Sequence, residues 1–216
     1  MHIVKAPARP QSLPEELANS VSHGIGFLAA VLAAPFFIGN ARANPDQGAL
    51  IGALAFSISA ALLYLSSTIY HALPRGGWKL WFDRLDHAAI YFLIAGSYTP
   101  FTLGALRGVW GWTLFGVVWT LAVVGATLKL TGVFKNRALS TALYLAMGWL
   151  VVVAAKPLLK NVPMPGLLWL AAGGLAYTVG VVFYNLKQVR YMHFVWHLFV
   201  LAGTACHAWA IYWYAG

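Results

Sequence analysis

Four histidines and one aspartate at the ends of apolar segments have the chemistry of a metal centre. They are His23, His71, Asp86, His193 and His197. Imidazole nitrogens and carboxylate oxygens are common zinc ligands, and ionisable groups at membrane depth are costly enough that they usually mark a functional site. His193 and His197 are four residues apart, so on a helix their imidazoles share one face and can reach the same ion.

Ser67 and His71 repeat this i,i+4 spacing at the end of another apolar segment. His71 is therefore expected to supply a third nitrogen, with Ser67 on the same helix face one turn deeper. Structural alternatives exist for both residues. His71 would be an interfacial residue before the turn at Pro74, and the Ser67 hydroxyl would bond its own i−4 carbonyl.

Asp86 follows His71 across a short turn and opens the next apolar segment. It is expected to act as a fourth ligand or to hold and deprotonate a metal-bound water. Three histidines and a water leave an open position, which marks a catalytic rather than a structural zinc. The alternative for Asp86 is a helix N-cap or a salt bridge to Arg84 or Arg75. Asp83 is expected to be the N-cap and a surface residue.

Glu16, Asn19 and His23 lie at positions i, i+3 and i+7, so they share one helix face. We expect this face to stand behind the metal ligands and to orient a ligand imidazole by hydrogen bonds. Direct ligation by His23 is the alternative.

Three other histidines are not expected at the metal. His2 lies in the N-terminal arm, and His87 points about 100° away from its neighbour Asp86 on a helix. His207 is ten residues beyond His197, about 15 Å along the helix axis. We expect His207 to donate an interhelical hydrogen bond.

The composition predicts an all-α integral membrane protein of one domain, residues 1–216. Of its 216 residues, 61% are hydrophobic and 9% are charged, whereas soluble domains have about 25% charged residues. A span needs about 20 apolar residues, and helices satisfy their own backbone in hydrocarbon. Seven segments qualify, roughly Leu17 to Gly39, Gly48 to His71, Leu85 to Leu106, Val109 to Leu130, Ala138 to Ala155, Gly166 to Leu186 and His193 to Tyr214.

The distribution of lysine and arginine predicts the orientation of this bundle. Of the 14 basic residues, 10 lie in the N-terminal arm (residues 1–15) and the even-numbered connections, and 4 lie in the odd-numbered ones. The positive-inside rule therefore places the N-terminus in the cytoplasm and the C-terminus outside. All five candidate residues of the metal centre then lie at helix ends that face the cytoplasm.

Several function classes find no support in the sequence. The net charge of +9 is not arranged as a basic stripe, so a nucleic-acid partner is not expected. Cys206 is the single cysteine, which excludes an internal disulfide. The chain has no phosphate-binding glycine loop, no Gly-x-Ser-x-Gly elbow and no run of charges that would line a pore.

The polar motifs, taken in order, resemble the hemolysin III family, the bacterial branch of the superfamily that contains the progestin and adiponectin receptors, with alkaline ceramidases as distant relatives. The motifs are Glu16-x-x-Asn19-x-x-x-His23, Ser67-x-x-x-His71, Leu85-Asp86-His87 and His193-x-x-x-His197.

The resemblance implies a seven-helix bundle in the bacterial cell (inner) membrane, with a zinc ion near the cytoplasmic face. Its ligands would be His71, His193 and His197, with Asp86 on a zinc-held water and Ser67 beside it. The long cytoplasmic arm of the animal receptors is missing here, which argues against receptor signalling.

Two functions follow from these residues. The first is a zinc-dependent intramembrane hydrolase with Asp86 as general base. Its substrate would enter between helices and would be a ceramide-like lipid amide or another acyl lipid. The second is a membrane sensor, a receptor-like protein or a pore-forming haemolysin in which zinc only braces the bundle. Membrane lipids are the expected partners, and the sequence predicts no oligomeric state.

Overall fold

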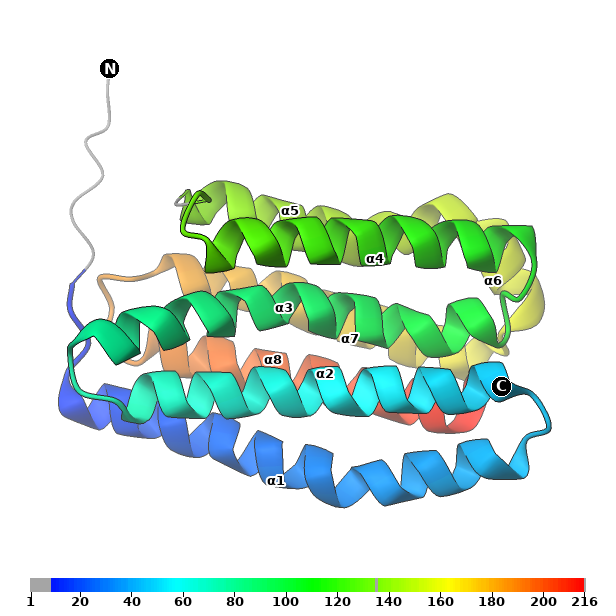
Figure 1. Ribbon diagram of the computed structural model, residues 1–216, viewed down its shortest axis with the longest axis horizontal. Coiled ribbons are helices and arrows are strands. Elements are labelled where there is room, and N and C mark those ends of the chain that lie inside the picture. Colours follow the sequence, from blue (N-terminus) through cyan, green and yellow to red (C-terminus); the bar gives the residue numbers. More distant parts are fainter. Residues whose placement is uncertain (1–8, 135, 216) are drawn as a thin grey trace.

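The computed structural model describes residues 9–134 and 136–215, and within these residues it contains helices and no strands. The long helices run side by side, and the first and last described residues lie at opposite ends of the bundle (Figure 1). In chain order the elements are α1 (Leu13–Ala43), α2 (Gln47–Ala72), α3 (Gly77–Leu103), α4 (Val109–Leu130), α5 (Arg137–Trp149), the 3₁₀ helix η1 (Leu150–Ala154), α6 (Ala155–Asn161), α7 (Met164–Asn185) and α8 (Met192–Tyr214).

Six segments of the described chain are long and apolar enough to cross a membrane, where the sequence predicted seven. They are α1, α2, α4, the continuous stretch Arg137–Asn161, α7 and α8. The chain is therefore a multi-pass membrane protein in contact with membrane lipids. The predicted third segment corresponds to α3, which has 27 residues and packs against α2 and α4. Polar residues along α3, among them Asp86, His87 and Thr99, lower its hydropathy.

The predicted boundary of the third segment was wrong at its start. It was placed at Leu85, but α3 begins at Gly77 with Gly76 as N-cap. The turns around Lys79 continue the helix beyond its apolar part, where hydropathy gives no signal. Asp86 and Asp83 therefore lie inside the helix, and neither is an N-cap. The first helix likewise begins at Leu13, within the predicted arm of residues 1–15, and residues 1–8 lie outside the described part of the chain.

The predicted fifth segment is one pass interrupted by η1. Pro157 stands in the first turns of α6 and has no N–H to donate to the carbonyl of Val153, so a regular α-helix cannot run through this point. The Tyr98 hydroxyl of α3 compensates the break. It contacts the carbonyl oxygens of Met147 and Gly148, at 2.9 and 2.8 Å, and accepts a hydrogen bond from the Val151 N–H. These contacts hold the 3₁₀ segment η1 against α3.

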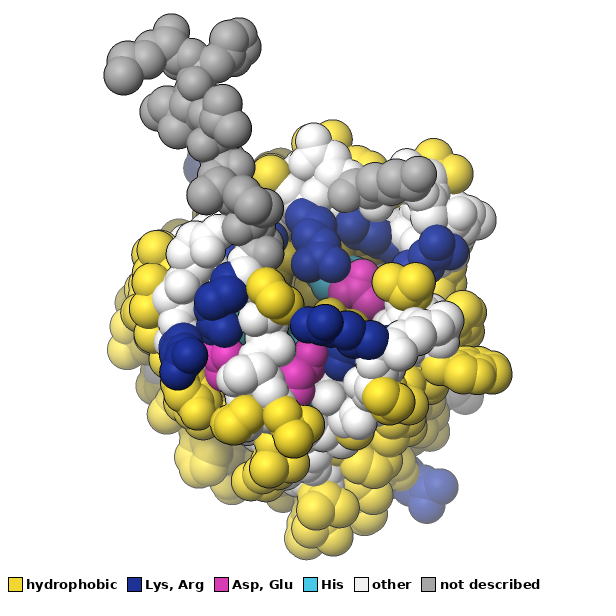
Figure 2. Space-filling view, turned by 90° about the vertical axis from the view of Figure 1, so that its left-hand side faces the viewer, with side chains coloured by type: hydrophobic (Ala, Val, Ile, Leu, Met, Phe, Trp, Pro, Cys, Tyr) yellow, Lys and Arg dark blue, Asp and Glu magenta, His cyan; other side chains and the backbone are white. Residues whose placement is uncertain are grey.

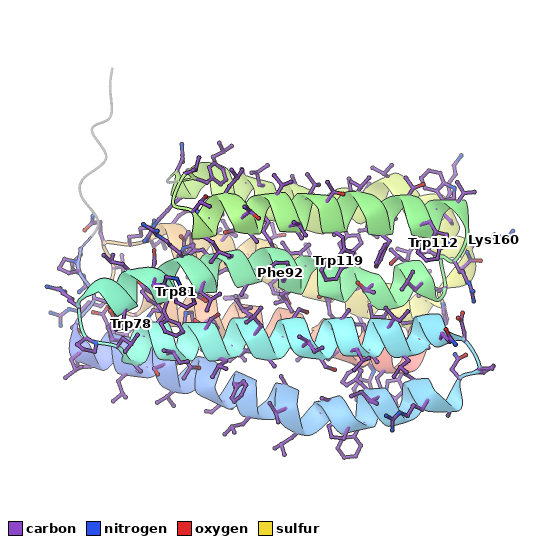
Figure 3. The ribbon with its side chains drawn as sticks, in the orientation of Figure 1. Trp78, Trp81, Phe92, Trp112, Trp119 and Lys160 are labelled. Carbon is purple, nitrogen blue, oxygen red and sulfur yellow. The ribbon has the colours of Figure 1, made fainter. Side chains whose placement is uncertain are left out.

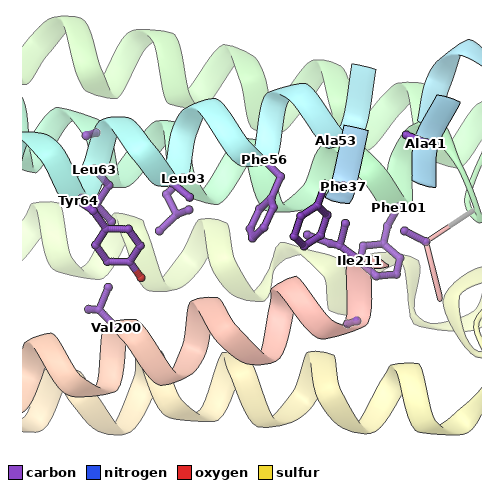
Figure 4. Packing of buried hydrophobic residues seen from close by; sticks show 14 of the residues in the cluster. Phe37, Ala41, Ala53, Phe56, Leu63, Tyr64, Leu93, Phe101, Val200 and Ile211 are labelled. Atoms are coloured by element: carbon purple, nitrogen blue, oxygen red, sulfur yellow. The ribbon is translucent and has the colours of Figure 1, made fainter. Parts of the chain in front are cut away.

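A buried apolar cluster joins α1, α2, α3 and α8 along the middle of the bundle (Figure 4). Phe37 and Phe56 are in contact, with ring centroids 5.6 Å apart, and Tyr64 and Val200 extend the cluster toward the end of the bundle where α1 begins. Gly26 of α1 allows this close approach, because a Cβ there would lie 2.9 Å from the Tyr64 ring. The cluster holds the polar face of α1 against α2 and α8.

Aromatic side chains mark both ends of the bundle, as interfacial belts do. Trp78 and Trp81 lie near the end where α3 begins, and Trp112 and Lys160 lie toward the opposite end (Figure 3). Both Trp78 and Trp112 are exposed.

Candidate metal centre

His71, His193 and His197 come together at one end of the bundle. One ring nitrogen from each lies within 4.8 Å of the other two. The ring centroids are 5.2 Å apart for His71 and His193, 5.0 Å for His71 and His197, and 4.8 Å for the i,i+4 pair. This cluster could hold a metal ion. Zinc–nitrogen bonds are about 2.0–2.1 Å long, so binding would draw the three rings slightly closer together.

The hydrogen bonds of His71 leave one nitrogen free for a metal. Its Nδ1 lies 2.7 Å from a carboxylate oxygen of Glu16, which can only accept, so Nδ1 carries the proton. Its Nε2 is buried and has no hydrogen-bond partner in the described residues. Buried polar nitrogens are rarely left unpaired. A carboxylate behind a histidine is the usual arrangement at protein metal sites, where it fixes the tautomer of the ligand.

His197 has the same tautomer for a different reason. Its Nδ1 lies 3.2 Å from the backbone carbonyl of Asn19 and 3.2 Å from the Ser22 hydroxyl. The carbonyl accepts the Nδ1 proton, and Nε2 keeps its lone pair. The His23 ring stacks on His197 with centroids 3.6 Å apart and planes 11° from parallel. Both His23 nitrogens are buried without partners in the described residues.

The start of α8 sets the position of His193. Tyr191, the N-cap residue, has a φ of 61°, a left-handed conformation that is rare for a residue other than glycine. Its N–H donates to the Glu15 carboxylate over 2.9 Å. Glu15 also closes a capping box with Ser12 at the start of α1. This one carboxylate therefore ties the first turn of α1 to the first turn of α8, next to His193.

Ser67 and Asp86 line a cavity with His193 and His197, and Ser67 faces Asp86. Ser66 and Thr68 bond carbonyls of their own helix. The Ser67 hydroxyl does not, and it is buried without a hydrogen-bond partner in the described residues. The alternative predicted for Ser67, a hydrogen bond from its hydroxyl to the carbonyl four residues earlier, is therefore wrong. Asp86 forms no ion pair with any described residue, which removes its alternative as a partner of Arg84 or Arg75.

Asp83 is only partly a surface residue. Its carboxylate oxygens both accept from Arg137 at 3.2 Å. Its backbone carbonyl lies 2.7 Å from the Nδ1 of His87, which accordingly donates. The Nε2 of His87 lies 3.4 Å from the Tyr184 hydroxyl. His87 is thus buried beside the cavity but is not part of the three-histidine cluster.

The cavity has a volume of about 540 Å³ and lies among α1, α2, α3, α5, α7 and α8. Its inner walls are mostly apolar, with Leu93, Phe101, Leu158 and Leu167 as examples. His207 lines the cavity farther along α8, and its Nε2 lies 3.3 Å from the Leu170 carbonyl of α7. This is the interhelical hydrogen bond expected of His207. His2, the third histidine set aside, lies outside the described residues.

Sequence reasoning missed two residues that shape this centre. Glu15 was passed over, although the Ser-x-x-Glu pattern from Ser12 to Glu15 is the signature of a capping box. Lys79 was counted only as an orientation signal. Its Nζ lies 3.1 Å from Glu16 and donates to the carbonyls of Tyr70 and Leu73 at the end of α2. No local pattern predicts such a bond between helices.

The bundle and its histidine cluster define a class of protein, a multi-pass membrane protein with a buried candidate metal centre at one end. The chain belongs to the haemolysin-III related family, whose model matches residues 11–208. This confirms the resemblance seen in the motifs.

Relatives of this chain occur in bacteria and in mammals. It is 42% identical to Hemolysin-3 of Bacillus cereus, over 90% of this chain and 89% of the relative. It is 41% identical to a Hemolysin-3 homolog of Bacillus subtilis (strain 168), over 94% and 95%. It is 30% identical to the monocyte to macrophage differentiation factor of Homo sapiens, over 97% and 90%.

Proposed function

We propose that this protein is a zinc-dependent hydrolase that cleaves the acyl bond of a lipid within the membrane. The observation that carries the proposal is the buried Nε2 of His71, which has no partner in the described residues and belongs to a ring that clusters with those of His193 and His197. Three nitrogen ligands leave an open position, which is typical of catalytic rather than structural zinc. Ser67 and Asp86 share the adjoining cavity and supply the polar groups that hydrolysis needs.

Each residue of the site would have a separate role in hydrolysis. The bound ion would supply Lewis acidity, which lowers the pKa of water and polarises a carbonyl. Asp86 would accept a proton from the attacking water and pass it to the leaving group, since its carboxylate has no ion pair with described residues. Ser67 would hydrogen-bond Asp86 and keep it oriented. Glu16 and Asn19 would hold the imidazoles of His71 and His197, and His23 would pack against His197.

The cavity supports a lipid as the substrate. Its apolar inner walls would take an acyl chain, and its polar end would place the headgroup side of the scissile bond near the histidines. A lipid amide of the ceramide type or another acyl lipid meets this description.

The proposal includes seven membrane spans in a single domain, with α3 as the seventh. Its 27 residues are long enough to span, and it lies within the bundle between α2 and α4 (Figure 1). An odd number of passes agrees with termini at opposite ends. The positive-inside rule then favours a cytoplasmic N-terminus in the bacterial inner membrane.

The first test is the metal content of the protein purified in detergent, measured by mass spectrometry. We expect about one zinc per chain, lost in the His193→Ala/His197→Ala double variant. His207→Ala is the matched control, because this buried histidine of the same helix lies outside the cluster and should leave the zinc in place. If His207→Ala removed zinc as completely as the double variant, the proposed site would be wrong.

The name of the bacterial relatives, Hemolysin-3, points to a second function, pore formation. Release of a membrane-impermeant dye from liposomes without lipid turnover would favour the pore. Turnover of defined lipids by the zinc-loaded protein, without dye release, would favour the hydrolase.

A further inference from the structure

Four basic side chains from four separate segments line the cavity at the end that holds the histidines. They are Arg9 before α1, Arg75 between α2 and α3, Arg137 at the start of α5 and Lys187 after α7. Figure 2 shows this end of the molecule. Dark-blue lysine and arginine side chains surround a hollow in which a histidine and an acidic side chain are visible. We call this ring of four the basic mouth.

The basic mouth is more than an orientation signal. Lys79, Arg84, Lys129 and Arg190 lie at the same end of the bundle without lining the cavity. With the two other basic residues of the N-terminal arm and the even-numbered connections they number six, against four in the odd-numbered connections, so the positive-inside pattern holds without the basic mouth. A cleft with low-dielectric walls that is lined with cations concentrates the field and attracts an anion. Basic pockets between helices on the cytoplasmic side are a known way to bind anionic lipid headgroups.

Three of the four acidic side chains near the basic mouth are paired, and the fourth, Asp86, lies deeper in the cavity without an ion pair to a described residue. Glu15 is bound by Arg9, which raises the pKa of that guanidinium. Glu16 is bound by Lys79 and His71, and Asp83 is bound by Arg137. Arg75 is exposed and makes no ion pair or hydrogen bond with a described residue. Its guanidinium is thus available to a ligand at the opening.

The order of groups along the cavity matches the order of groups in an anionic acyl lipid. The cations stand at the opening, the histidines and Asp86 come next, and the apolar walls lie beyond. A glycerolipid phosphate is only a few bonds from its acyl carbonyl, and the acyl chain follows. Guanidinium groups match phosphate oxygens in a bidentate geometry.

We propose that the basic mouth binds the phosphate of an anionic acyl lipid, so the preferred substrate has a net negative headgroup and is not a neutral ceramide-like amide. This inference deepens the proposed function, because it names the substrate class of the same site. The binding step can nevertheless be tested without hydrolysis.

The experiment measures equilibrium binding in neutral detergent with dialkyl ether lipids, which have no acyl bond to cleave. The probes are ether-linked phosphatidylglycerol, ether-linked phosphatidylcholine and neutral dialkylglycerol. The wild-type protein should bind the phosphatidylglycerol analogue most tightly. Arg75→Gln should weaken that binding roughly tenfold, as expected for the loss of a charged hydrogen-bond donor. Arg75→Lys should retain part of the affinity. Arg190→Gln, an exposed cation at the same end but outside the cavity, should bind as the wild type does.

Two results would overturn the inference. One is equal weakening in Arg75→Gln and Arg190→Gln, which would reduce the effect to general surface charge. The other is equal binding of the neutral and anionic probes.

Parallel turnover assays separate this inference from the proposed function. Selective binding of the anionic ether lipid, with no hydrolysis of its ester-linked counterpart, would support the basic mouth and refute the hydrolase. Hydrolysis of a neutral amide lipid at a rate that Arg75→Gln leaves unchanged would support the hydrolase and refute the anionic substrate.

Discussion

The bond between Glu16 and His71 offers a measurable test of how the metal centre is assembled. The Glu16 carboxylate accepts the Nδ1 proton of His71 over 2.7 Å and pairs with Lys79 over 3.1 Å. Glu16→Gln keeps the size of the side chain but removes its charge, so His71 becomes a weaker and less well-oriented ligand. Loss of such a contact typically costs about 10–100-fold in metal affinity, or roughly 1.4–2.7 kcal/mol at 1.36 kcal/mol per tenfold change.

The assay is a competition titration of zinc against a chromogenic chelator, with the protein in detergent. Asp46→Asn is the matched control, because it removes one carboxylate from an arginine pair in the α1–α2 connection, at the opposite end of the bundle. Its zinc affinity should equal that of the wild type. If Glu16→Gln also bound zinc with wild-type affinity, the carboxylate would not support the ligand, and the tautomer argument for His71 would fail.

Three further outcomes follow from the same structure. Asp86→Asn should retain its zinc and lose lipid turnover, and turnover at the parent rate would remove Asp86 as the general base. Gly26→Val should lower the free energy of unfolding by about 1–3 kcal/mol, because a Cβ there would lie 2.6 Å from the Leu201 side chain. Gly39→Val, where nothing lies within 4 Å of that Cβ, should cost less, and thermal unfolding in detergent compares the two. A hydrogen bond from the Gly48 N–H lowers the pKa of the Asp46 carboxyl, and the charge of Arg107 lowers it further. The stability from Asp46 should therefore be present above the unfolded carboxyl pKa of about 3.9 and be lost as the pH falls through the folded value. Over that range the melting temperature of the wild type should fall more than that of Asp46→Asn.

The sequence predicted the helices well where hydropathy and secondary structure share a boundary. The helix α4 starts and ends at the predicted residues, Val109 and Leu130. The prediction from hydropathy failed where a helix continues beyond its apolar part, as α3 does before Leu85. The sequence-based prediction also missed the break inside the fifth pass, because apolar periodicity continues through the break that Pro157 imposes and that Tyr98 of another helix stabilises.

The candidate site was likewise predicted only in part. The spacing of His193 and His197 and the resemblance of the motifs were enough to select the three histidines that the fold brings together. The tautomers were not predictable, because they depend on contacts across the bundle, such as the Asn19 carbonyl on His197. The capping-box pattern could have indicated Glu15, but its bond to the Tyr191 N–H, 176 residues away in sequence, was not predictable. Local patterns identify ligands, but the groups that orient them are fixed by tertiary packing.

The position of the histidines at the edge of a cavity bears most directly on their role. A structural zinc is closed by four protein ligands, and such a site gains nothing from an adjoining cavity. Here His193 and His197 form part of the wall of a 540 Å³ cavity whose inner surface is mostly apolar. Ser67 and Asp86 are buried beside them. In the described residues Ser67 has no hydrogen-bond partner and Asp86 has no ion pair, so their burial costs folding free energy. A metal that only stabilised the bundle would not require this cost. That cost is understandable if these groups are held ready for a substrate, and it is the reason to favour catalysis over a structural metal.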